Sequence, residues 1–117
     1  MKKKQEPLTE SYFYILLCLY SKPLHGYGIM QEAARLSDGN VKIGSGTMYG
    51  AVSNMLKKGW IEEFDSEDPN DNRKKLYRLT ESGRETLETE IERLKHLLDS
   101  VSEVMGGNGH EDKNDKL

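Results

Sequence analysis

The chain has 117 residues, a formal net charge of −3 and a hydrophobic fraction of 35%, which suits one domain of ordinary size with part of the chain as solvated helix or tail. Its longest apolar run, Ile15 to Tyr20, is far too short to cross a bilayer, and no signal-peptide pattern is present, so we expect no membrane partner. The single cysteine, Cys18, excludes an internal disulfide and favours a cytoplasmic protein.

The first two predicted elements are helices. Thr9 can cap a helix that is apolar nearly all round and ends before Pro23. Such a helix is expected at the buried centre of a domain, with Cys18 in its core. A second helix is expected to open near Gly26, and the sequence Asp38-Gly39-Asn40 is a stop signal for it.

A third helix, a hairpin and a long helix are predicted to follow. The third helix should begin around Ser45 to Thr47 and end at the glycine cap Gly59. Apolar alternation over residues 60–64 and 76–79, around a polar and acidic loop, predicts a β-hairpin. Thr80 can cap the last helix, which is expected to run to about Met105.

This order of elements is that of a winged helix-turn-helix domain, in which the third helix reads the major groove of DNA and the hairpin is the wing. The expected fold class is mainly α with a small β-hairpin, followed by a long C-terminal dimerisation helix. We expect a basic arm over residues 1–8, a DNA-binding domain over 9–80, a dimerisation helix over 81–105 and a disordered tail over 106–117.

The last helix carries a regular apolar seam. Its members, three or four residues apart, are Leu87, Ile91, Leu94, Leu98, Val101 and Met105. This spacing is typical of the contact between two helices of a dimer. The alternative is a helix that packs on its own domain.

The glycine-rich stretch before and within the third helix raises the question of a nucleotide site. Gly44 and Gly46 begin the spacing G-x-G-x-x-G, but Tyr49 stands where the third glycine should be. No βαβ unit surrounds the stretch, and the P-loop pattern is absent. We therefore predict no nucleotide pocket and no cofactor.

Helical spacing instead gathers small and polar residues on one side of the third helix. That side holds Gly46, Thr47, Gly50, Ser53, Asn54 and Lys57, with Tyr49 at its boundary. Ser45, Thr47 and the free N–H groups of the helix start can donate to phosphate. Ser53 and Asn54 have the chemistry for base edges, and Lys57 can reach a phosphate or a guanine. The alternative is an ordinary solvated helix face.

Three segments resemble the PadR family of bacterial transcriptional regulators: PLHGYGIMQ, IGSGTMYGAVSNMLKKGWIE and RKKLYRLTESGRETL. The resemblance covers about Leu8 to Met105 and is nearest to the compact subgroup with one C-terminal helix. It implies a winged-helix domain, a dimerising C-terminal helix and repression through an operator. It also implies that Gly26 and Tyr27 lie beside the DNA backbone.

For several of these residues the sequence leaves two roles open. Tyr27 can offer its hydroxyl to phosphate or only pack against the first helix, and Tyr49 can offer its hydroxyl or stay half-buried between helices. The basic triplet Arg73, Lys74 and Lys75 is expected to contact phosphates, with Arg73 as a candidate for the minor groove. Its alternative is a solvated strand edge.

Catalysis and metal binding are not expected. Glu92 and His96 lie one turn apart but lack a third ligand, and no catalytic arrangement of Ser, His, Asp or Cys is legible. The sequence thus predicts a homodimeric DNA-binding regulator, a repressor, on a pseudo-palindromic double-stranded operator. Release by a small hydrophobic or aromatic effector between the long helices is a further expectation. The alternative is a winged-helix protein-interaction module without specific DNA binding, motivated by the acidic hairpin loop.

Overall fold

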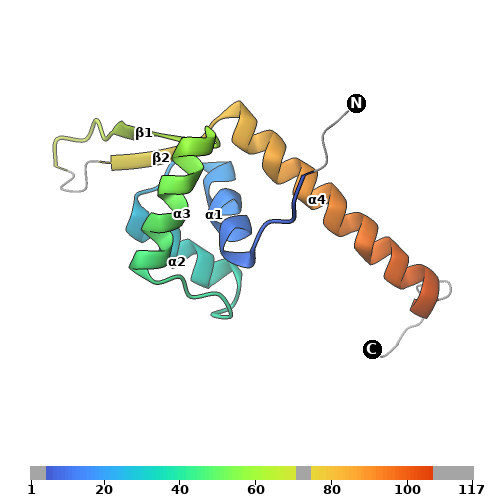
Figure 1. The fold of residues 1–117 in the computed structure, drawn as a ribbon. Helices are drawn as coiled ribbons and strands as arrows, with labels where there is room; N and C mark the ends of the chain where they lie inside the picture. The colour runs from blue at the N-terminus through green and yellow to red at the C-terminus, as the bar shows by residue number, and fades with distance from the viewer. Residues whose placement is uncertain (1–4, 71–74, 107–117) are drawn as a thin grey trace.

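The computed structural model describes residues 5–70 and 75–106 as a group of helices with a hairpin at one side and a long helix crossing at the other (Figure 1). The elements are α1 (Glu10–Ser21), α2 (Gly26–Leu36), α3 (Ser45–Lys58), β1 (Ile61–Asp65), β2 (Lys75–Leu79), α4 (Glu81–Val101) and a π-helical segment (Ser102–Gly106). The predicted winged helix-turn-helix order, mainly α with one small hairpin, is confirmed.

The predicted helix ends have the expected cap geometry. Thr9 Oγ1 accepts a hydrogen bond from the N–H of Tyr12 (3.1 Å), and Thr80 Oγ1 accepts one from Gly83 (3.0 Å). Each satisfies a donor that the first helical turn leaves without a backbone partner. Gly59 ends α3 in the left-handed conformation, with φ of 78°, which glycine adopts without the strain of a side chain.

The core forms around α1, as its apolar composition predicts. Ile15 and Leu16 are fully buried, and Cys18 is buried beside them. The other helices each contribute at least one fully buried side chain: Ile29 from α2, Met48 and Met55 from α3, and Leu87 from α4. Burial of these apolar side chains is the main force holding the helices together.

The hairpin is joined to the turn between α1 and α2. Its strands pair antiparallel, with Ile61 opposite Leu79. Leu24 forms two backbone hydrogen bonds with Tyr77 (3.1 and 3.0 Å), and His25 Nδ1 donates to the carbonyl oxygen of Lys75 (2.9 Å). This isolated bridge, which adds a third segment beside the two strands, was not predicted. A single residue next to a proline gives no strand pattern in the sequence. The base of the wing is therefore fixed beside the start of α2.

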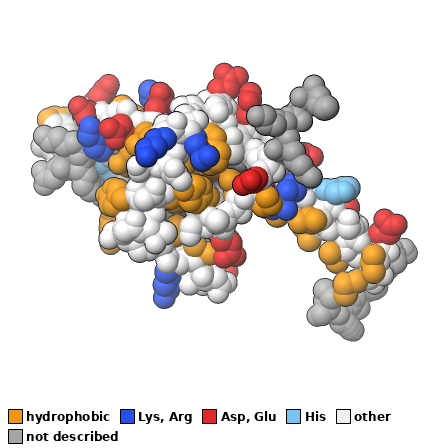
Figure 2. Space-filling model, viewed as in Figure 1, with side chains coloured by type: hydrophobic (Ala, Val, Ile, Leu, Met, Phe, Trp, Pro, Cys, Tyr) orange, Lys and Arg blue, Asp and Glu red, His pale blue; other side chains and the backbone are white. Residues whose placement is uncertain are grey.

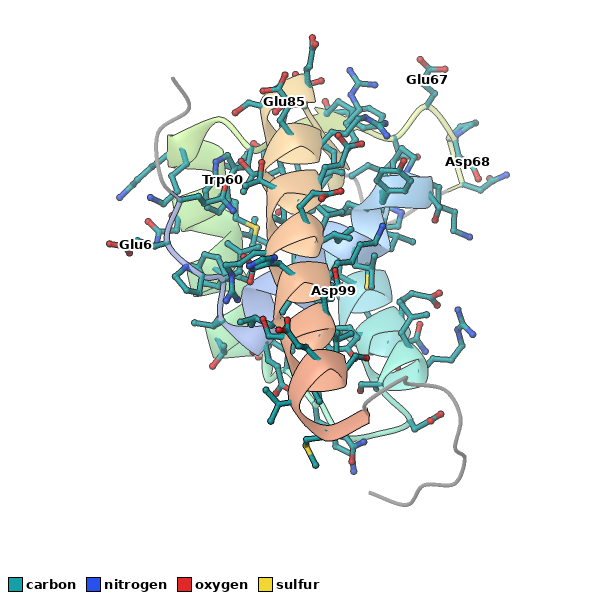
Figure 3. The ribbon with its side chains drawn as sticks, turned by 90° about the vertical axis from the view of Figure 1, so that its right-hand side faces the viewer. Glu6, Trp60, Glu67, Asp68, Glu85 and Asp99 are labelled. Carbon is teal, nitrogen blue, oxygen red and sulfur yellow. The ribbon has the colours of Figure 1, made fainter. Side chains whose placement is uncertain are left out.

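The long helix α4 packs on the domain by its first turns and then extends beyond the other elements (Figure 1). Glu85 lies near its start and Asp99 near its far end (Figure 3). The α-helix ends at Val101 and continues as the π-helical segment, so the predicted single helix to Met105 changes its winding over its last turn. Within the described ranges, none of the helices has the length and apolar character that crossing a membrane requires.

Candidate nucleic-acid interface

The two sides of α3 differ as helical spacing predicts. Its inner side is formed by Met48, Ala51, Val52 and Met55, all buried. Its outer side holds the predicted residues Ser45, Gly46, Thr47, Tyr49, Gly50, Ser53, Asn54 and Lys57, and every one of them is exposed. The structure therefore brings these residues together on one surface, which we call the α3 face.

The packing of the protein itself does not explain the glycines of the α3 face. A Cβ added at Gly46 or Gly50 would meet no atom within 4 Å, and neither residue has a positive φ. Glycine inside a helix is less favourable than alanine by about 0.5–1 kcal/mol. Neither packing nor backbone conformation thus requires glycine at these positions.

The start of α3 presents backbone donors to solvent. The first helical hydrogen bond runs from the N–H of Met48 to the carbonyl oxygen of Gly44 (2.8 Å), so the N–H groups of Ser45, Gly46 and Thr47 precede the helical ladder. Gly44 has no side chain with which to cap them. Such a helix start attracts anions, because its N–H groups and the helix dipole both favour negative charge.

Tyr49 lies against the start of α2 and is also exposed. A Cβ at the buried Gly26 would lie 2.8 Å from the Tyr49 hydroxyl and 2.7 Å from Met48 Cε, so Gly26 allows α2 and α3 to approach closely. Tyr49 is nevertheless 52% exposed, and Tyr27, on the first turn of α2, is 56% exposed. Both side chains are thus accessible to a ligand on this surface, while the hydroxyl end of Tyr49 also lies against Gly26 of α2.

Asn54 has a partner that sequence reasoning missed. Its Nδ2 donates a hydrogen bond to the hydroxyl of Tyr12 in α1, at 2.8 Å. The two residues are 42 positions apart, and helical spacing within either helix carries no signal for the contact. Tyr12 therefore joins the predicted residues at the edge of the α3 face.

The basic triplet is represented here by one residue. Arg73 and Lys74 lie outside the described residues. Lys75 is exposed at the start of β2, with its Nζ 3.6 Å from Glu63 Oε2 and 3.7 Å from Asp65 Oδ1. Its charge is therefore partly balanced within the hairpin.

Charge is unevenly spread over the surface. From Asn40 to Ile61 the only charged side chains are Lys42, Lys57 and Lys58, all exposed. Figure 2 shows lysine side chains over α3, and acidic ones over the start of α4 and, mixed with basic ones, over the hairpin. The hairpin loop carries Glu67 and Asp68 at the outer edge of the molecule (Figure 3). The α3 face is thus the part of this surface best suited to a polyanion.

The apolar seam of α4 divides into two halves. Leu87 is fully buried in the core of its own protomer, so it packs within its chain and is not exposed to a partner. Ile91 packs at the edge of the same core, and Leu94 is half-buried. The remaining predicted seam residues, Leu98, Val101 and Met105, are exposed, as are their neighbours Leu97 and Val104.

The described side chains that could bind a metal ion or act as a nucleophile are not arranged to do so. Among residues 5–70 and 75–106, His, Cys, Asp and Glu side chains form no group of three that could hold a metal ion, and Glu92 and His96 gain no third ligand there. Burial raises the pKa of the Cys18 thiol to about 11, which leaves it protonated and unreactive at neutral pH.

Known proteins share both the sequence pattern and the fold. Residues 15–89 match the family described as "Transcriptional regulator PadR-like family". No curated protein sequence matches the chain. A solved transcriptional regulator from Clostridium thermocellum is 22% identical, with 81% of this chain and 89% of that chain covered and a TM-score of 0.69.

Two further structures carry the family name. A PadR family transcription regulator from Clostridium difficile R20291 is 26% identical, with 81% of this chain and 96% of that chain covered and a TM-score of 0.66. Bacillus subtilis PadR, solved in complex with operator DNA, is 22% identical, with a TM-score of 0.61, 68% of this chain covered and 45% of that chain. Because the family match spans well over half of its length, the chain belongs to the PadR-like family of transcriptional regulators.

Proposed function

We propose that the protein is a homodimeric regulator that binds a specific DNA operator through the α3 face and represses transcription there. The observation that carries this proposal is the exposed pair Gly46 and Gly50, which internal packing does not require. Close approach of a DNA duplex to α3 would explain these glycines, because a side chain at either position would hold the two surfaces apart.

The chemistry of the α3 face supports a duplex as the ligand. The N–H groups at the start of α3 and the hydroxyls of Ser45 and Thr47 suit phosphate oxygens. Ser53 and Asn54 suit base edges, and Lys57 adds a positive charge at the far end of the helix. Tyr27 and Tyr49 would extend the phosphate contacts towards the start of α2.

The wing would contribute less than the helix. Lys75 is already within 3.7 Å of two carboxylates, and the described loop residues Glu67 and Asp68 repel phosphate. We therefore assign the main DNA contacts to α3 and the start of α2. Arg73 and Lys74 remain candidates for backbone contacts, as their sequence position suggests.

Dimerisation is proposed through the second half of α4. Leu98 is 67% exposed, and the neighbouring apolar residues of the helix are also uncovered. Contiguous exposed apolar surface of this kind marks an interaction site. A second copy is the expected occupant because the spacing of the seam is that of paired helices. Two copies would present two α3 faces to a pseudo-palindromic operator.

The related Bacillus subtilis PadR was solved with operator DNA, which supports the same ligand class here. The place that the sequence suggests for an effector is between the long helices of two protomers. The groove of about 890 Å³ on α4 is lined mostly by polar and acidic residues, including Glu85, Glu88 and Glu92. A hydrophobic or aromatic ligand would find few apolar contacts there.

A titration of the full chain against a labelled duplex from its own promoter region tests the proposal. We expect specific binding whose affinity falls steeply as salt rises, because phosphate contacts release counterions. Transcription from the same promoter should fall when the protein is added. The acidic hairpin favours one rival function, a protein-interaction module without specific DNA binding. Equal affinity for the promoter and an unrelated duplex at low salt would favour that rival.

A further inference from the structure

The exposed edge of α3 is joined to α1 by one side-chain contact. Asn54 Nδ2 lies 2.8 Å from the Tyr12 hydroxyl and donates a hydrogen bond to it. The Tyr12 ring is half-buried and packs against the hydrophobic core, so the hydroxyl is held in place by the domain. The exposed amide of Asn54 is thereby hydrogen-bonded to a side chain that packs against the core.

This contact lies at one edge of the α3 face. At about 100° per residue, Gly50 and Ser53 lie near the middle of the α3 face. Tyr49 stands on the edge beside α2, and Asn54 stands on the opposite edge, beside α1. The strip of small residues is therefore bordered on both sides by a polar side chain that another helix supports.

We propose that Tyr12 is a positioning residue, which orients the carboxamide of Asn54 so that it reads an adenine in the major groove. This inference rests on the proposed function. A carboxamide without a partner rotates freely about its bond to Cβ, and the hydrogen bond from Asn54 Nδ2 to the Tyr12 hydroxyl limits that rotation. Here one N–H is given to Tyr12, which leaves Oδ1 and the second N–H for the ligand. An acceptor beside a donor matches N6 and N7 of adenine.

The hydroxyl of Tyr12 has a second capacity. It accepts a hydrogen bond from Asn54, and no acceptor for its own proton is found among the described residues. That proton is therefore available to a phosphate oxygen of the same duplex. Prior ordering also lowers the entropy lost when the amide binds.

The test uses the full chain and a duplex library with randomised half-sites, from which the protein selects its preferred sequence. The variants are Tyr12→Phe, Asn54→Ala and the double variant, with Tyr14→Phe as a matched control. Tyr14 lies in the same helix and is half-buried, and its ring packs edge-on against Phe13. For the unaltered protein we expect one adenine whose replacement weakens binding about tenfold.

Tyr12→Phe and Asn54→Ala should each remove most of this discrimination at the same base pair, and the double variant should lose no more than Asn54→Ala alone. Tyr14→Phe should select the original sequence. Unchanged discrimination in Tyr12→Phe, or equal weakening for all sequences, would overturn the inference and leave the proposed function standing. If the unaltered protein selects no sequence, the proposed function fails and the inference fails with it.

Discussion

Glu90 and Arg93 in α4 are joined by two hydrogen bonds, of 3.0 Å from Arg93 Nε to Oε1 and 2.7 Å from Nη2 to Oε2. The Glu90 side chain is almost completely buried, and its Oε2 also accepts a hydrogen bond from the backbone N–H of Leu8 (3.2 Å). Gln5 adds a bond from its Nε2 to the carbonyl oxygen of Thr86 (3.2 Å). The segment before α1 is thus held along α4, close to where that helix leaves the domain.

The variant Glu90→Gln should lose stability in a way that depends on pH. Arg93, followed by the Leu8 N–H, lowers the pKa of Glu90 in the folded protein. A lowered pKa contributes stability above the unfolded value, near 4.5, and this contribution is lost as pH falls through the folded value. We expect the variant to be less stable by about 1.5–3 kcal/mol at neutral pH, with the difference shrinking in acid.

Urea denaturation at neutral and acidic pH would measure this difference. Glu88→Gln is the control, because Glu88 is an exposed carboxylate on the same helix. It should change stability little at either pH. A stability difference for Glu90→Gln that stays constant as the pH falls would contradict the assignment to the ionised carboxylate.

Replacing Gly50 with alanine should separate stability from binding. The added methyl group meets open space, and alanine is the better helix former, so the free energy of unfolding should rise by about 0.5–1 kcal/mol. The same methyl group would stand between α3 and the duplex, so affinity for promoter DNA should fall. Thermal unfolding and a DNA titration of the same sample measure the two effects. Unchanged affinity in the stabilised variant would remove the main argument for the α3 face.

Gly83→Ala should have the opposite effect on the fold. A Cβ at Gly83 would clash with the backbone carbonyl oxygen of Trp60, at the junction of β1 and α4. The backbone cannot move aside as a flexible side chain does. We therefore expect the free energy of unfolding to fall by about 1–3 kcal/mol. A lower melting temperature for Gly83→Ala beside a higher one for Gly50→Ala would show that the two glycines serve different purposes. Equal melting temperatures would contradict both assignments.

Lys57→Ala should weaken DNA binding without changing sequence preference. Lys57 is exposed on the α3 face, and loss of one phosphate contact reduces the slope of log affinity against log salt by about 1. Lys95→Ala is the matched control, since Lys95 is an exposed lysine on α4. Titrations at several salt concentrations give both slopes. If the two variants behave alike, Lys57 only contributes to the general charge of the protein.

The sequence predicted most of the fold because its signals are local. Thr9, Thr80 and Gly59 mark helix ends through hydrogen bonds and backbone geometry within a few residues, and the period of the apolar residues separated the two sides of α3. The contacts it missed join distant segments. The pairing of Leu24 with Tyr77 and the bond from Asn54 to Tyr12 depend on how elements dock, which no local pattern records.

The seam of α4 illustrates a different limit of sequence reasoning. One continuous period runs from Leu87 to Met105, yet Leu87 packs on its own domain and Leu98 is exposed. Periodicity identifies which side of a helix is apolar, but not what covers each part of that side. The buried and the exposed half of the seam meet where α4 leaves the domain, and this position is known only from the structure.

The variant Leu98→Glu should therefore dissociate the proposed dimer and leave the protomer folded. Leu98 lies in the exposed half of the seam, where a carboxylate disturbs no contact of the protomer's own core. In a two-fold dimer the change occurs twice, and each lost apolar burial is worth about 1.5 kcal/mol or more. The dimerisation constant should therefore weaken by about a hundredfold or more.

Analytical ultracentrifugation over a range of protein concentrations would measure this change. The control is His96→Glu, which adds the same charge at an exposed position on the opposite side of α4 and should leave the dimer intact. Leu98→Glu should also lose most of its affinity for a two-half-site duplex, while binding to a single half-site stays similar, because only the coupling between protomers is removed. If the unaltered protein sediments as a monomer, or if both variants remain dimers, another surface than the exposed half of α4 must join the copies.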